Sequence, residues 1–72
     1  MPNPLQDLAS KACDTAFQQS VITATTVLMT NLTVAAGDAA QVNDSRAKYQ
    51  AALALCKHTH DMASAVIGTV FA

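Results

Sequence analysis

Residues 46–71, RAKYQAALALCKHTHDMASAVIGTVF, carry the clearest structural signal in this chain. Their apolar side chains recur every three or four residues, which places them on one stripe of an α-helix. That stripe consists of Tyr49, Ala52 or Leu53, Cys56, His60, Ala63, Ile67 and Val70. The spacing therefore predicts a helix over about residues 46–71.

The N-terminal part of the chain carries the signals of a helix start. Asn3 is a capping residue, Pro4 suits the first helical position, and Gln6 completes a capping-box pattern. A first helix is therefore expected over about residues 4–36. Its apolar stripe is expected to open with Leu5, Leu8 and Ala12 and to continue with Phe17, Val21, Ala24, Leu28, Leu32 and Ala35.

Residues 21–34 are the ambiguous part of this first segment. Nine of these fourteen residues are β-branched, which lowers helix propensity and favours a strand as the alternative. The helix is preferred because no turn residue interrupts residues 5–36 and the segment begins with a cap. The threonine hydroxyls are expected to bond back to the preceding helical turn.

A loop is expected over residues 37–45, which are rich in Gly, Asp and Asn. Gly37 is a natural helix end, and Asp44 or Ser45 could cap the second helix. The predicted fold class is all-α: one domain, residues 1–72, forming a two-helix antiparallel hairpin (helix–turn–helix).

A hairpin of this size has little core of its own. The chain has 72 residues and only three aromatic side chains, Phe17, Tyr49 and Phe71. Several apolar residues, among them Ile22, Met29 and Met62, lie off the main stripes, and contiguous exposed apolar surface usually marks an interaction site. We therefore expect oligomerisation to complete the fold.

The residues expected to mediate packing and self-association lie on these stripes or at the end of the second helix. They are Phe17, Val21, Leu28, Leu32, Tyr49, Leu53, Cys56, Ile67, Val70 and Phe71.

Charge is sparse, with four Lys or Arg residues against five Asp, so nucleic acid is not an expected partner. Residues 15–37 are uncharged, but their threonines make a stable membrane span an unfavourable interpretation. The first ten residues show no cleavable signal pattern. The expected location is the cytoplasm or, through a dedicated secretion system, the cell exterior.

The reactive side chains gather in residues 56–61. On a helix, Cys56 and His60 lie one turn apart with Asp61 nearby, whereas His58 points to another face. One helix thus offers two or three of the four ligands of a structural zinc site, so a metal-dependent module ranks only third among the hypotheses. We predict no catalytic residue, no metal site and no cofactor, because a hairpin offers no enclosed cleft for a Cys–His pair.

Cys13 and Cys56 lie in different halves of the chain. Small buried thiols are the preferred interpretation, and a disulfide between antiparallel segments remains the alternative.

The second predicted helix resembles the C-terminal segment of type III secretion needle proteins and their inner-rod relatives. Gln50 and Leu53 match residues of that family. Cys56 stands where the family usually has Tyr, and Asp61 to Ser64 stand in place of its Asn-x-x-Ser element. Aliphatic residues follow, as in the family, although Gly68 replaces an expected basic residue. This resemblance implies a hairpin that polymerises into a hollow filament.

A second, Ala- and Thr-rich family looks similar through other segments. Thr30-Asn31, Gly37-Asp38-Ala39 and Tyr49-Gln50 resemble the proteins that build bacterial R-bodies. Both resemblances imply a self-polymerising bacterial structural protein.

The expected function is therefore that of a non-catalytic structural subunit that self-assembles into a helical filament, needle or pilus-like assembly. A homo-oligomer is the expected state, and a secretion-system component or another protein is a further expected partner. The alternative is a small helical-hairpin interaction module that binds one protein partner or forms a small bundle.

Overall fold

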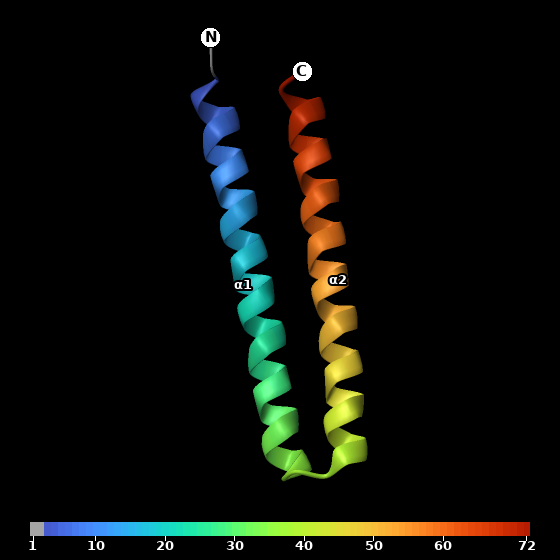
Figure 1. The fold of residues 1–72 in the computed structure, drawn as a ribbon. Helices are drawn as coiled ribbons and strands as arrows, with labels where there is room; N and C mark the ends of the chain where they lie inside the picture. The colour runs from blue at the N-terminus through green and yellow to red at the C-terminus, as the bar shows by residue number, and fades with distance from the viewer. Residues whose placement is uncertain (1–2) are drawn as a thin grey trace.

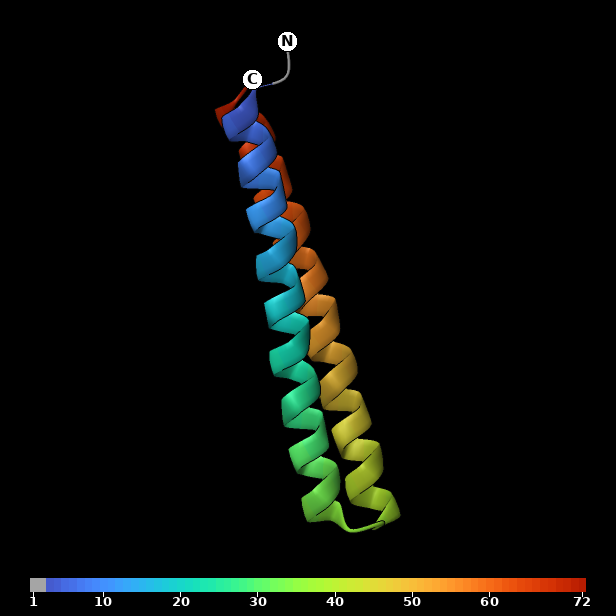
Figure 2. The same cartoon turned by 90° about the vertical axis from the view of Figure 1, so that its left-hand side faces the viewer.

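The computed structural model describes residues 3–72. Two helices of equal length, α1 (Pro4–Ala35) and α2 (Ala39–Val70), run antiparallel and pack side by side (Figure 1). The molecule is a rod with extents of 55 × 15 × 11 Å, and the first turn of α1 lies beside the last turn of α2 (Figure 2). The predicted all-α antiparallel hairpin is confirmed.

Helix α1 begins where its capping signals place it. The backbone N–H of Leu5 donates to Oδ1 of Asn3 at 3.0 Å, and the backbone N–H of Asp7 donates to the Asn3 carbonyl at 3.1 Å. Pro4 occupies the first turn, where its missing N–H costs nothing. The cap therefore satisfies backbone donors that the helix itself leaves without partners.

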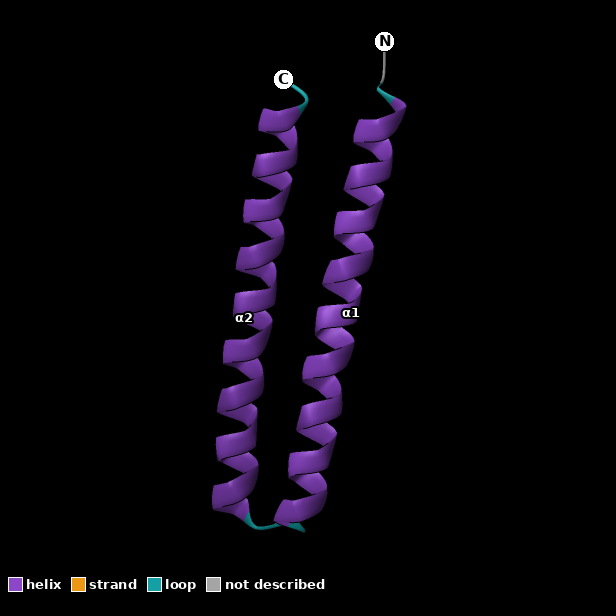
Figure 3. Cartoon of the chain, turned by 180° about the vertical axis from the view of Figure 1, so that it is seen from behind, coloured by secondary structure: helices purple, strands orange, loops and turns teal. Residues whose placement is uncertain are grey.

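Residues 21–34 are helical throughout, which resolves the helix-or-strand ambiguity (Figure 3). The threonines of this segment satisfy their hydroxyls locally: Thr23, Thr26 and Thr30 each donate to the carbonyl four residues earlier at 2.9 to 3.1 Å. This predicted back-bonding is thereby confirmed: the hydroxyls of these exposed threonines are paired within the helix.

The turn is shorter than the predicted residues 37–45. Ala36 and Gly37 adopt the left-handed conformation with φ of 49° and 86°, and α2 already begins at Ala39. The cap of α2 is Asp38, whose Oδ1 accepts from the backbone N–H of Gln41 at 2.9 Å. The expected caps Asp44 and Ser45 are therefore wrong.

The polar residues that suggested a longer loop are accommodated inside α2. Ser45 donates to the carbonyl of Gln41 at 2.9 Å, and Lys48 pairs with Asp44 at 3.0 Å one turn away. Asp44 and Ser45 thus each find a partner within the helix, and the helix continues through them.

The helices meet along one stripe each, which we call the seam. Among the described residues only Ala35 and Ser45, both in the half nearer the turn, are buried, each with 5% of its surface exposed. The other seam side chains are half-buried: Gln6, Ala9, Cys13, Phe17, Val21, Ala24, Thr25, Leu28 and Asn31 of the first half, and Val42, Tyr49, Ala52, Leu53, Cys56, His60, Ala63, Ile67 and Phe71 of the second. The core of this hairpin is therefore a single line of contact.

Candidate self-association surface

The seam places most of the predicted packing residues between the helices. Phe17, Val21 and Leu28 of α1 are half-buried against α2. The half-buried residues of the second half include the predicted Tyr49, Leu53, Cys56, Ile67 and Phe71. Their part in self-association stays a prediction.

Two predicted packing residues lie away from the seam. Val70 is 69% exposed, because the step of four residues from Ile67 leads to Phe71 and leaves Val70 on the flank. Leu32 is 38% exposed at the edge of the seam, where Asn31 takes the inner position.

The predicted opening of the first stripe is also wrong. Leu5 and Leu8 are largely exposed, and Ala12 is exposed as well. Counting back from Phe17 in steps of four gives Cys13 and Ala9, which are the residues that face α2. The predicted positions were one residue out, which rotates a side chain by about 100° around a helix.

The two shortest polar contacts across the seam join hydroxyl and ring groups of the two helices. The Thr25 and Tyr49 hydroxyls lie 2.8 Å apart, and Nε2 of His60 lies 2.8 Å from Oδ1 of Asp14. The His60 ring also packs on Phe17, with ring centroids 4.9 Å apart. These contacts fix which turn of α1 faces which turn of α2.

The surroundings of His60 change the acid–base behaviour of two side chains. The Asp14 carboxylate raises the pKa of His60; partial burial acts in the opposite sense, and Asp61 raises it further. The Lys57 ammonium, 3.0 Å from Oδ2 of Asp61, holds the pKa of that carboxyl below its usual value. All these groups are close to solvent, so their pairing adjusts stability rather than creating a buried charge site.

The cysteine and histidine cluster of residues 56–61 is divided by the fold. Cys56 and His60 face the seam, whereas His58 is exposed elsewhere. Within residues 3–72, no three His, Cys, Asp or Glu side chains lie close enough together to hold a metal ion. The three residues of the metal hypothesis are therefore not brought together.

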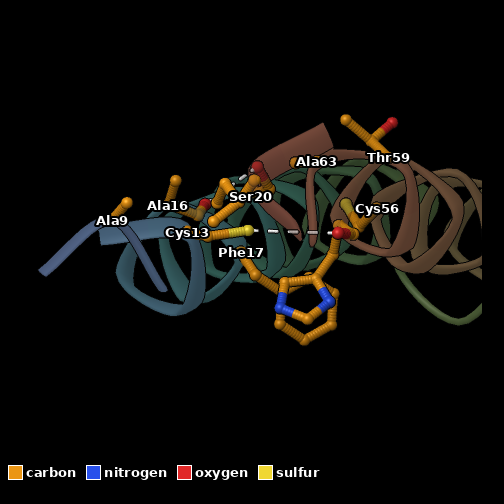
Figure 4. A pocket seen from close by; sticks show the side chains of 10 residues that line it. Ala9, Cys13, Ala16, Phe17, Ser20, Cys56, Thr59 and Ala63 are labelled. Carbon is orange, nitrogen blue, oxygen red and sulfur yellow. Dashed lines mark hydrogen bonds between the residues drawn. The ribbon is translucent and has the colours of Figure 1, made fainter. Parts of the chain in front are cut away.

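A groove of about 300 Å³ runs over the seam near the open end of the hairpin, and both free cysteines line it. The Cys13 thiol donates to the His60 carbonyl oxygen at 3.9 Å (Figure 4). Short side chains form the rim: Ala9, Ala16 and Ser20 from α1, and Thr59 and Ala63 from α2. The groove therefore lies on one particular side of the hairpin.

The rim residues belong to one continuous stripe on each helix, which together we call the uncharged face. At spacings of three and four along a helix, side chains stay on one side. On α2 the stripe is free of ionisable side chains from Ala52 to the open end. The members of the two stripes are Leu5, Ala9, Ala12, Ala16, Ser20, Thr23, Val27 and Val34 on α1, and Ala52, Leu55, Thr59, Met62, Val66 and Val70 on α2. The nearest charges on this side, Asp44 and Lys48, lie at the turn end and pair with each other.

The opposite side, which we call the charged face, carries most of the ionisable side chains. Asp7, Lys11 and Asp14 follow one another at helical spacing on α1, as do Arg46, Lys57 and Asp61 on α2. The Asp14–His60 contact brings the two sets together on one side. Sequence reasoning missed this division, although the positions of the charges along each helix carry the signal for it.

The hairpin exposes more surface than a compact protein of its mass. Its accessible area is 5386 Å² for 7.5 kDa, whereas a compact monomer of that mass exposes about 4,200 Å². Within residues 3–72, eleven large hydrophobic side chains are exposed, among them Leu55, Met62 and Val66. Neither described helix combines the length and apolarity needed to cross a membrane. This surface fits assembly or the binding of a partner.

Comparison of the chain with protein families, with curated proteins and with solved structures finds no match. The fold and the exposed apolar surface are therefore the observations on which a functional proposal rests.

Proposed function

We propose that this chain is a non-catalytic structural subunit that self-assembles into a filament. The observation that carries the proposal is the imbalance between core and surface: within residues 3–72 two residues are buried, while eleven large hydrophobic side chains are exposed. Leaving so much apolar area in water forgoes about 25 cal/mol for each Å² that a neighbour could cover. Association with further copies would recover that free energy.

The distribution of the exposed apolar side chains favours an open-ended assembly. Leu55, Met62 and Val66 lie on the uncharged face, whereas Ile22 and Met29 share a stripe with Lys11 on the other side of α1. A contact on one side thus leaves apolar residues free on the other. Surfaces that are not used up by one closed contact allow subunits to add repeatedly.

The resemblance of residues 50–71 to needle subunits agrees with this proposal, because those proteins are also helical hairpins that polymerise. In this role the hairpin is a structural element whose side chains pack against neighbouring copies and take no part in catalysis.

Negative-stain electron microscopy together with light scattering tests the filament directly. Filaments that lengthen with protein concentration are the expected result. A single small oligomer of fixed mass at every concentration would instead establish the alternative, a discrete interaction module, and would overturn the filament.

A further inference from the structure

The uncharged face carries a hollow and a ridge side by side. The hollow is the groove over the seam, bordered by the short side chains of Ala9, Ala16 and Ala63. The ridge is formed by Leu55, Met62 and Val66, which project from α2. A surface with both shapes can be complementary to itself: a two-fold rotation sets the ridge of each copy on the hollow of the other.

The area that a lone hairpin leaves exposed suits a second copy. Two hairpins would need to bury about 3,700 Å² between them to reach the surface of one compact protein of twice the mass. Obligate dimers bury about 2,000–5,000 Å², so this requirement falls within their range. One further copy is thus sufficient to supply the missing core.

The distribution of charged side chains makes one face more favourable than the other for binding this copy. Covering the charged face would remove water from Asp14, Lys57 and Asp61, which is costly unless each finds a new partner. Covering the uncharged face from Ala52 to the open end desolvates no charged side chain on its two stripes. Lys48 and Asp44 continue the α2 stripe toward the turn and pair with each other, and His58 borders Leu55 and Met62. Two uncharged faces also bring no like charges together.

We propose that the uncharged face binds a second copy of this chain about a two-fold axis, forming a four-helix bundle in which Leu55, Met62 and Val66 of each hairpin occupy the hollow of the other. This inference rests on the proposed self-assembly and names its first contact. Ile22 and Met29, which share a stripe with Lys11 on the other side of α1, lie outside this contact.

A matched pair of methionine variants tests the assignment in sedimentation experiments on the full chain. Met62, on the ridge, is 57% exposed, and Met29, on the other side, is 64% exposed. Met62→Lys should raise the dissociation constant of the dimer by about 100-fold or more, because each dimer would bury two unpaired ammonium groups. Met29→Lys should leave that constant within about threefold of the wild type.

A second variant separates shape complementarity from general hydrophobic attraction. Ala16→Phe adds apolar area at an exposed position that lines the hollow, and it replaces no seam residue. It should weaken the dimer if the hollow receives the partner's ridge. Strengthened association would contradict the proposed fit.

The outcomes distinguish this inference from the proposed function. A wild-type chain that stays monomeric overturns both. A wild-type chain that assembles, with Met62→Lys no weaker than Met29→Lys, overturns the two-fold contact and leaves self-assembly standing. Circular dichroism of each variant verifies that its helices are retained.

Discussion

Substituting Ile67 by Asp should destabilise the hairpin itself, apart from any effect on assembly. Ile67 is half-buried in the seam and lines the groove beside Phe17 and Ala63. Full burial of an Ile side chain is worth about 1.5–3 kcal/mol, so half-burial contributes about 1–1.5 kcal/mol. Partial desolvation of the new carboxylate adds about 1–3 kcal/mol, giving a total loss of about 2–4 kcal/mol.

That loss is large for so small a protein, because a single core of this size rarely supplies more than about 3–5 kcal/mol. Ile22 supplies the matched control, because it is 56% exposed on the other side of α1. Ile22→Asp should cost no more than about 1 kcal/mol, chiefly through helix propensity. Urea unfolding followed by circular dichroism measures both changes. Equal losses for the two variants would refute the assignment of Ile67 to the seam.

Three further predictions address the pH dependence, the turn and the cross-helix hydroxyl pair. Since the fold raises the pKa of His60, its contribution to stability is complete below its ordinary pKa of 6.5 and is lost as pH rises through the folded value. Thermal melts between about pH 5.5 and about pH 8.5 should show that loss in the wild type and not in Asp14→Asn. Gly37→Ala should destabilise the protein by about 1–2 kcal/mol, because the backbone of Gly37 is left-handed and an alanine there is strained. Gly68→Ala, within α2, should stabilise it by about 0.5–1 kcal/mol. Urea unfolding should therefore show changes of opposite sign in the free energy of unfolding for the two variants. Tyr49→Phe should cost about 1 kcal/mol in the same assay by removing the hydroxyl contact with α1, and an unchanged midpoint would contradict that contact.

The helices were predictable because several local signals agree. Asn3 and Pro4 define the start of α1, and the three-and-four spacing from Tyr49 to Ile67 defines α2. The β-branched residues 21–34 are helical as well, because the cap at Asn3 and the absence of a turn residue outweigh their lower helix propensity.

The turn was not predictable from composition alone. Asn43, Asp44 and Ser45 are typical loop residues, yet Ser45 bonds to the preceding turn and Asp44 pairs with Lys48, so α2 extends to Ala39. The local sequence of residues 39–45 is compatible with a loop and with a helix, and the cap at Asp38 favours the helix.

The length of the turn also sets which residues face each other across the seam. An expected loop of nine residues leaves the register of the two helices open. The pairing of His60 with Asp14 was therefore beyond reach from the sequence, although each residue's place on its own helix was not. The division into an uncharged and a charged face needs no register and could have been predicted from the helical positions of the charges.

Circular dichroism over about a hundredfold dilution tests the central claim, that the hairpin depends on further copies of itself, most directly. If neighbours complete the core, helicity and the unfolding temperature should both fall as the chain is diluted, in parallel with a falling mass in light scattering. A monomer that melts cooperatively at a temperature independent of concentration would contradict the claim.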